Sequence, residues 1–131
     1  MNASVKKFNP SKEYFFEEGC HIIEISNSTD DEDVSIAQAR VEVGQQTQWH
    51  HLENTIERYV ILQGSGEVEI GKAKPQKLSV GDVAIIPAST QQRIKNIGDE
   101  DLIFLAICSP RFQGDHYRRG QTIDSSEPTS D

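Results

Sequence analysis

The chain has 131 residues, and its 13 lysine and arginine residues against 21 aspartate and glutamate residues give a formal net charge of −8. That length fits one domain, because a single hydrophobic core usually occupies about 100–150 residues. The acidic balance leaves no basic surface for nucleic-acid phosphates or anionic lipids, so no nucleic-acid or membrane partner is expected. No stretch approaches the ~20 apolar residues of a membrane helix, and the first residues lack the apolar core of a secretion signal, so we expect a cytoplasmic protein.

Short runs rich in valine, isoleucine and aromatic residues recur along the chain, whereas helical periodicity is almost absent. This pattern predicts an all-β fold. The expected strands cover residues 21–26, 34–43, 47–52, 57–63, 67–70, 76–80, 82–86, 92–96 and 102–108. Turns that contain glycine or proline separate them, which indicates a series of hairpins.

The composition divides the chain into three parts. Residues 1–33 hold N-terminal strands and an acidic loop, residues 34–110 form one barrel or sandwich, and residues 111–131 form a C-terminal extension with a polar tail. The acidic run at residues 29–33 and the tail at residues 121–131 offer little apolar surface to bury, so both are expected to be solvated. The tail is expected to be dispensable for stability.

Several expected strands are apolar on both faces. In residues 57–63, Tyr59 and Ile61 alternate with Val60 and Leu62, and residues 102–108 show the same pattern. An antiparallel strand with one solvated face would instead alternate apolar and polar residues. Either the N-terminal strands or a second subunit must cover the outer face, and we expect a homodimer.

A segment in the middle of the chain, GQQTQWHHLENTIERYVILQG, has a regular spacing of glycine, histidine and glutamate. Its marked positions are separated by five, one, four and six residues, and they are Gly44, His50, Leu52, Glu57 and Gly64. A second segment, GDVAIIPASTQQRIKN, follows. Its marked positions are Gly81, Pro87, Ser89, Gln92 and Asn96.

The two segments resemble, in order and in spacing, the two conserved motifs of the cupin family. The resemblance implies a double-stranded β-helix, or jelly-roll, cupin barrel. It also implies that the family's metal ligands fall at His50, Leu52, Glu57 and Gln92. Two of these positions depart from the family pattern, because leucine cannot bind a metal and Gln92 offers only an amide oxygen in place of an imidazole. The site is therefore degraded or specialised.

Strand geometry predicts which side chains share the barrel interior. Side chains alternate between the faces of a strand, so Gln48 and Leu52 share the face of His50, and Tyr59 shares the face of Glu57. The interior then holds a polar cluster among apolar neighbours, which is typical of a ligand pocket. We expect Gln48 and Gln92 to contribute to ligand binding.

Two interpretations of this cluster remain open. His50, Glu57 and Gln92 would suit one divalent metal such as Zn, Mn, Fe or Ni, with water at the remaining positions. Alternatively, His50 and Glu57 pair with each other, and Gln92 completes their hydrogen bonds.

The resemblance implies a small enzyme of the sugar-phosphate isomerase or epimerase type. In that case a metal would polarise the substrate, and Glu57 or His50 would carry the proton. A metal-independent epimerase with His50 as the base and Tyr59 as the acid needs only the same cluster. The alternative is a non-catalytic cupin that binds or senses a small molecule through a degenerate metal site.

A basic cluster follows the last expected strand. Arg111, Arg118 and Arg119 lie near Tyr117 and could hold an anionic group such as a sugar phosphate. The alternative is that they form an ordinary solvated surface.

Overall fold

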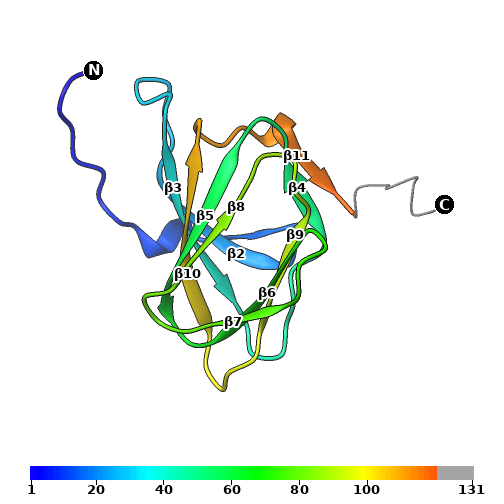
Figure 1. Ribbon diagram of the computed structural model, residues 1–131. Coiled ribbons are helices and arrows are strands. Elements are labelled where there is room, and N and C mark those ends of the chain that lie inside the picture. The colour runs from blue at the N-terminus through cyan, green and yellow to red at the C-terminus, as the bar shows by residue number, and fades with distance from the viewer. Residues whose placement is uncertain (121–131) are drawn as a thin grey trace.

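The computed structural model describes residues 1–120, so the expectations about residues 121–131 lie outside the described part of the chain. Its strands form two antiparallel sheets that face each other around a closed core (Figure 1). The six-stranded sheet has the order β1 (Tyr14–Phe16), β2 (Cys20–Ser26), β3 (Ser35–Val41), β10 (Leu102–Ser109), β5 (Ile56–Gln63) and β8 (Val83–Ile86). The five-stranded sheet has the order β11 (Tyr117–Arg119), β4 (His50–Leu52), β9 (Gln92–Asn96), β6 (Gly66–Ile70) and β7 (Gln76–Leu78).

The all-β prediction is confirmed. The helical segments of residues 1–120 are two short 3-10 turns, η1 (Pro10–Lys12) and η2 (Gly114–His116). Within that part of the chain, no helix has the length and apolar character that crossing a bilayer requires.

Alternation along the central strands builds the core. The inward side chains of β5 and β10, such as Tyr59, Ile61 and Phe104, are buried between the sheets, as is Ile94 of β9. A smaller cluster forms where β4, β10 and β11 approach one another, and it consists of Leu52, Cys108 and Tyr117. This second cluster lies next to the cavity described below.

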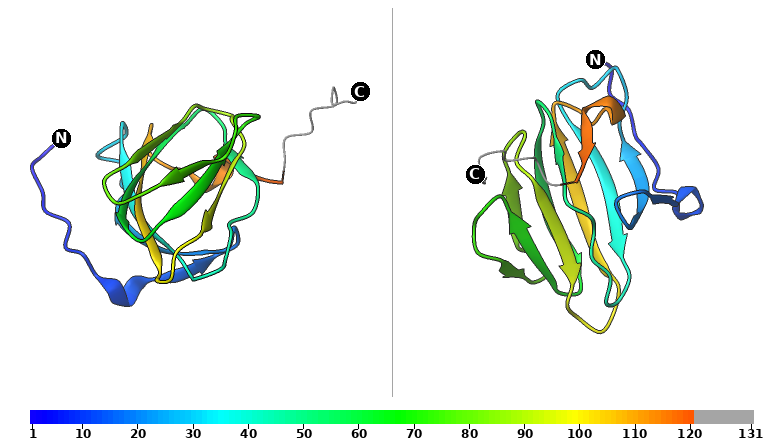
Figure 2. Two further views of the ribbon diagram at one scale, coloured as in Figure 1. Left: turned by 60° about the horizontal axis from the view of Figure 1, so that its bottom comes forward. Right: turned by 90° about the vertical axis from the view of Figure 1, so that its right-hand side faces the viewer.

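The segments outside residues 34–110 build walls of the same barrel. The β1–β2 hairpin pairs with β3, and β11 pairs with β4. Figure 2 shows the hairpin in blue and β11 in orange beside the central strands. Two of the three-residue strands, β1 and β11, are absent from the strands that the sequence predicts. The expected strand at residues 47–52 is also shorter than predicted, because its first part leaves the ladder and the Gln48 N–H donates to the Glu18 carbonyl at 2.7 Å.

Ser89, which replaces a motif glycine, has a positive φ of 62°. A side chain in this left-handed region costs about 1 kcal/mol, so Ser89→Gly is expected to raise the free energy of unfolding by up to ~1 kcal/mol. Urea denaturation measures the change. The neighbouring Ala88 does not have a positive φ, so Ala88→Gly relieves no strain and is expected to destabilise the protein by making the unfolded chain more flexible. An equal decrease in the free energy of unfolding in Ser89→Gly and Ala88→Gly would contradict the expectation.

Candidate functional site

A cavity of about 60 Å³ lies inside the barrel between the β1–β2 hairpin, the inner face of β3, β10 and β5, and strands β4 and β11. Small side chains create this space. Ala37 and Ala106 are direct cross-strand partners, and Ala39 faces Phe104 in the next pair of the same face. All four side chains line the cavity.

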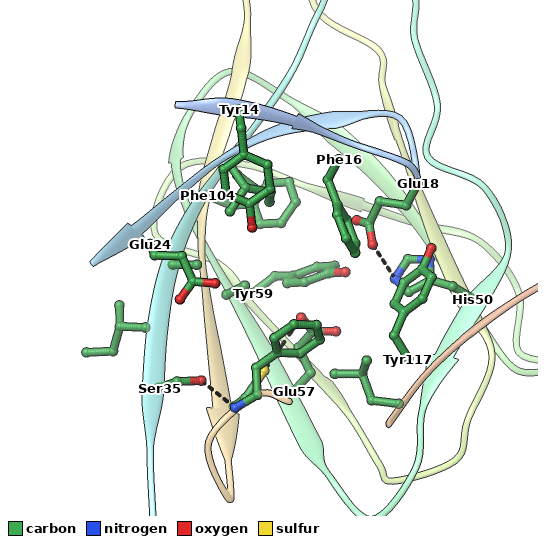
Figure 3. A pocket seen from close by; sticks show the side chains of 18 residues that line it. Tyr14, Phe16, Glu18, Glu24, Ser35, His50, Glu57, Tyr59, Phe104 and Tyr117 are labelled. Atoms are coloured by element: carbon green, nitrogen blue, oxygen red, sulfur yellow. Dashed lines mark hydrogen bonds and ion pairs between the residues drawn. The ribbon is translucent and has the colours of Figure 1, made fainter. Parts of the chain in front are cut away.

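The cavity has a buried floor and an exposed rim. His50 and Glu57 at the floor are 2% and 8% exposed, and Tyr59 beside them is also buried. Tyr14 at the rim is 44% exposed, and Glu24 of β2 is exposed as well. Figure 3 shows these side chains around the same space, with the Glu24 carboxylate turned toward it. A ligand would therefore enter past Tyr14 and Glu24 toward the buried polar groups.

A hydrogen-bonded chain of three side chains runs along one wall. The Tyr59 hydroxyl donates to Oε1 of Gln92 at 2.5 Å, and Nε2 of Gln92 donates to Oε1 of Glu57 at 2.5 Å. Gln92 is fully buried, and both atoms of its amide group are used. The amide thus fixes Glu57 and Tyr59 relative to each other.

Burial raises the pKa of Glu57 to about 7. The loss of hydration favours the neutral carboxyl group, the positive charge of a protonated His50 opposes this effect, and the negative charge of Glu18 adds to it. The second oxygen, Oε2, is 3.8 Å from Sγ of Cys108. At neutral pH, Glu57 can therefore either hold or release a proton.

His50 pairs with Glu18 instead of Glu57. Its Nδ1 donates to the Gln48 backbone carbonyl at 2.7 Å, which leaves Nε2 at 3.4 Å from Oε1 of Glu18. The imidazole also stacks on the Tyr117 ring, with centroids 5.4 Å apart. The ring orientation of His50 is thus fixed by backbone and aromatic contacts.

Glu18 is one of the site residues that the sequence prediction missed. It lies in the turn between β1 and β2, where Gly19 has a φ of +105°, and its Oε2 accepts a hydrogen bond from Sγ of Cys20 at 3.2 Å. The Gln48 N–H bond to the Glu18 carbonyl brings this turn against the start of β4. No local motif connects Glu18 with His50, because their contact is made only by the packing of the hairpin.

The structure places the predicted residues as follows. His50, Glu57 and Tyr59 line the cavity, and Gln92 makes hydrogen bonds to Glu57 and Tyr59. The prediction that Leu52 faces the interior is confirmed. The predicted inward orientation of the Gln48 side chain is wrong, because this side chain is exposed and the backbone carbonyl of Gln48 is the group that reaches His50. The irregular backbone before β4 breaks the alternation on which that prediction depended.

The basic cluster does not converge on the cavity. Arg111, Arg118 and Arg119 pair with three different carboxylates, Glu32, Glu53 and Glu17, at 3.3, 3.2 and 3.4 Å. None of these arginines is among the described residues that line the cavity, and that lining contains no lysine or arginine. The described lining therefore offers no lysine or arginine to hold an anionic group.

The donor set does not fit a metal ion. Among residues 1–120, no group of three or more His, Cys, Asp or Glu side chains is placed to hold one. Of the predicted ligands, Gln92 already bonds through both amide atoms to Tyr59 and Glu57, and Leu52 supplies no donor. His50 and Glu57 remain, which is too few for a stable site.

Leu52→His is expected to tighten Zn²⁺ binding at least about tenfold, because the new imidazole would share the cavity with His50 and Glu57. Titration calorimetry of the wild type and the variant measures the affinity. His50→Ala in the Leu52→His background should remove the gain. Indistinguishable curves for all three proteins would show that these positions do not converge as described.

Comparisons with known proteins agree with this architecture. The family model described as "Cupin domain" matches residues 37–108. The oxalate decarboxylase OxdC of Bacillus subtilis is 30% identical over 101 residues, which is 74% of this chain and 25% of that protein. The chain thus spans about a quarter of the length of this curated relative.

Solved structures share the fold. KdgF from Halomonas sp. superposes with a TM-score of 0.70 at 21% identity, over 83% of this chain and 96% of that one. Pac13, described as a nucleoside dehydratase, superposes with a TM-score of 0.73 at 16% identity, over 95% and 98% of the two chains. A variant of Pac13 from Streptomyces was solved with uridine. At these identities the similarity shows the double-stranded β-helix fold alone.

Proposed function

The chain belongs to the cupin family, whose domain covers residues 37–108. We propose that its barrel binds a small polar metabolite and transfers a proton to and from it, as an isomerase or epimerase does. The observation that carries the proposal is Glu57, a buried carboxyl group facing the cavity with a pKa of about 7. A general acid or base works best when its pKa lies near the operating pH.

The neighbouring side chains have distinct roles in this proposal. Ionised Glu57 accepts the proton from the bound metabolite, and protonated Glu57 returns one. Gln92 positions the carboxyl group, and Tyr59 holds the Gln92 amide in place. Burial raises the pKa of Tyr59 well above its usual value, so its hydroxyl group stays protonated and continues to donate. The neighbouring pair of His50 and Glu18 offers a second proton carrier at the floor of the cavity.

This proposal assigns the proton transfer to side chains, because the predicted metal ligands are too few and Gln92 is engaged elsewhere. A sugar phosphate is not favoured as the metabolite, since the lining has no lysine or arginine. The alternative function, non-catalytic binding, is supported by the same loss of metal ligands at Leu52 and Gln92.

A ligand screen that includes a variant with a filled cavity tests the proposal. Thermal shift with a panel of small neutral, cationic and anionic metabolites identifies compounds that stabilise the wild type. Ala106→Leu fills the cavity and should abolish those shifts, whereas Ala88→Leu, an equal change at an exposed position, should not.

Catalysis is then measured with the compounds that bind. Incubation in D₂O followed by NMR should show deuterium entering the bound compound with wild-type protein and not with Glu57→Gln. Compounds that bind in the barrel but never exchange deuterium would support the non-catalytic alternative. Shifts that persist in Ala106→Leu would contradict the proposed location.

We also propose a homodimer. The outer face of β5 and β8 exposes several apolar side chains, of which Leu62, Val83 and Ile85 are 45%, 51% and 63% exposed. Strand β3 does not cover it, because β3 lies beside β10 in the same sheet. Light scattering is expected to give twice the chain mass of 14.7 kDa, and Ile85→Lys should restore the monomer. A wild-type monomer at micromolar concentration would contradict this prediction.

A further inference from the structure

We propose that the ligand of this cavity is a small organic cation, bound through an ammonium group that sits between aromatic rings and carboxylates. The inference rests on the proposed function in one respect, namely that the cavity is the ligand site. It adds the charge and chemical class of the ligand, which neither the family nor the motifs specify.

The charge of the lining is the first observation. Three carboxyl groups face the cavity, from Glu18, Glu24 and Glu57, against one side chain that can carry a positive charge, His50, and no lysine or arginine is among its described lining residues. They come from three separate elements, the β1–β2 turn, β2 and β5. A cavity with this charge attracts cations and repels anions.

The aromatic content of the walls is the second and independent observation. Six aromatic side chains line the space, and they are Tyr14, Phe16, Tyr59, Phe104, Phe112 and Tyr117. The rings approach from different directions: Phe16 meets Tyr117 edge-on at 5.1 Å, and Tyr59 meets Phe104 at 4.4 Å. Aromatic faces attract ammonium groups, and a cage of several rings is the usual way that proteins bind quaternary ammonium.

The N-terminal hairpin supplies two of the six rings, Tyr14 and Phe16. Tyr14 pairs with Ile22 and Phe16 pairs with Cys20, so alternate residues of β1 and β2 face the cavity. Glu24 continues the same face of β2. Phe112 packs against the Leu52, Cys108 and Tyr117 cluster, and its N–H donates to the Ser35 hydroxyl at 2.8 Å.

The size of the cavity limits the ligand. A volume of about 60 Å³ corresponds to roughly four to six water-sized positions, at about 10–15 Å³ for each water. This is room for an ammonium head group with a short chain. Glu24 at the exposed rim would guide the cation inward, and Glu57 at the floor would meet it.

The proton on Glu57 gives the proposal a distinctive signature. Besides Gln92, the groups that act on this carboxyl group are His50, Glu18 and Cys108, and of these only a protonated His50 is cationic. A bound cation would favour ionised Glu57, so binding should release protons near pH 7 and affinity should rise from pH 6 to pH 8. A neutral ligand of the same shape gives no such release.

Calorimetry with defined probes tests the proposal. Choline and ethanolamine are the cations, 3,3-dimethylbutan-1-ol is the neutral isostere of choline, and inorganic phosphate is the anion. At least one cation is expected to bind, about tenfold or more tighter than the neutral isostere, with phosphate not binding. Titrations in two buffers of different ionisation enthalpy should reveal proton release for the cation only.

Substitutions in the cavity lining test where the cation binds. Glu24→Gln and Phe16→Ala should each weaken cation binding at least about threefold, whereas Glu100→Gln, the same charge change at an exposed turn, should leave it unaltered. Binding of neither cation, or equal binding of choline and its neutral isostere, would overturn the proposal.

The two proposals fail separately. A neutral or anionic compound that exchanges deuterium in the barrel would overturn the cation assignment and leave the proposed function intact. A cation that binds in the cavity without exchange would overturn the catalytic function and leave the ligand assignment intact.

Discussion

Gln92→Leu is expected to lower the free energy of unfolding by about 3–5 kcal/mol, because the leucine leaves two buried polar groups without partners. Tyr59 loses its acceptor and the Glu57 carboxyl group loses its amide donor, and both side chains are buried. Urea denaturation at pH 7 measures the change. Gln45→Leu, the same substitution at an exposed position, is expected to change stability by less than about 0.5 kcal/mol.

A second substitution shows whether the loss of stability in Gln92→Leu comes from the broken hydrogen bonds or from altered packing. If Gln92→Leu destabilises the protein because buried polar groups lose their hydrogen-bond partners, adding Glu57→Leu should recover part of the stability, since it removes the buried carboxyl group. A double variant whose loss equals the sum of the single losses would show that the two residues do not act together.

Stability is expected to fall between about pH 4.5 and pH 7 through the contribution of Glu57. The folded protein keeps this proton up to a pKa of about 7, whereas the unfolded chain releases it near the usual 4.5. Within that window the folded state binds more protons than the unfolded state, so raising the pH costs roughly 1–3 kcal/mol. Glu57→Gln should remove this fall.

The measurement is the difference between wild type and Glu57→Gln in urea titrations at several pH values. Glu100→Gln serves as the control for removing an exposed charge. A pH dependence that is unchanged in Glu57→Gln would contradict the assigned pKa. Groups whose pKa is lowered, such as Glu13 beside Arg40, act in the opposite direction and cancel in this comparison.

Most strands were predictable from the sequence, and the short edge strands β1 and β11 were not. Strand β9 occupies the predicted residues, Gln92–Asn96, because Gln92, Ile94 and Asn96 alternate inward along its whole length. Strand β11, Tyr117–Arg119, has one inward residue and two arginines, so no alternation marks it. It is a strand because β4 offers an edge to pair with.

The site residues in regular strands were also predictable from the sequence, whereas the site residue in a turn was not. Motif spacing and strand alternation placed His50, Glu57, Tyr59 and Gln92 together, because all four lie in or beside regular strands. Glu18 reaches the cavity through a turn, and its contact with His50 depends on a hairpin that local sequence does not reveal. The exposure of Gln48 has the same origin, since backbone bonds to the Glu18 turn take that segment out of the ladder.

The titration of Glu57 tests the account most directly. In protein labelled with ¹³C at the glutamate carboxyl carbons, the Glu57 resonance is identified by its absence from Glu57→Gln and is followed by NMR from pH 3 to pH 9. The account predicts a midpoint near 7, because the carboxyl group is buried beside Glu18 and faces the cavity. A midpoint near the usual 4.5 would mean that Glu57 is fully ionised at neutral pH, and it would contradict the proton-transfer role on which the proposed function depends.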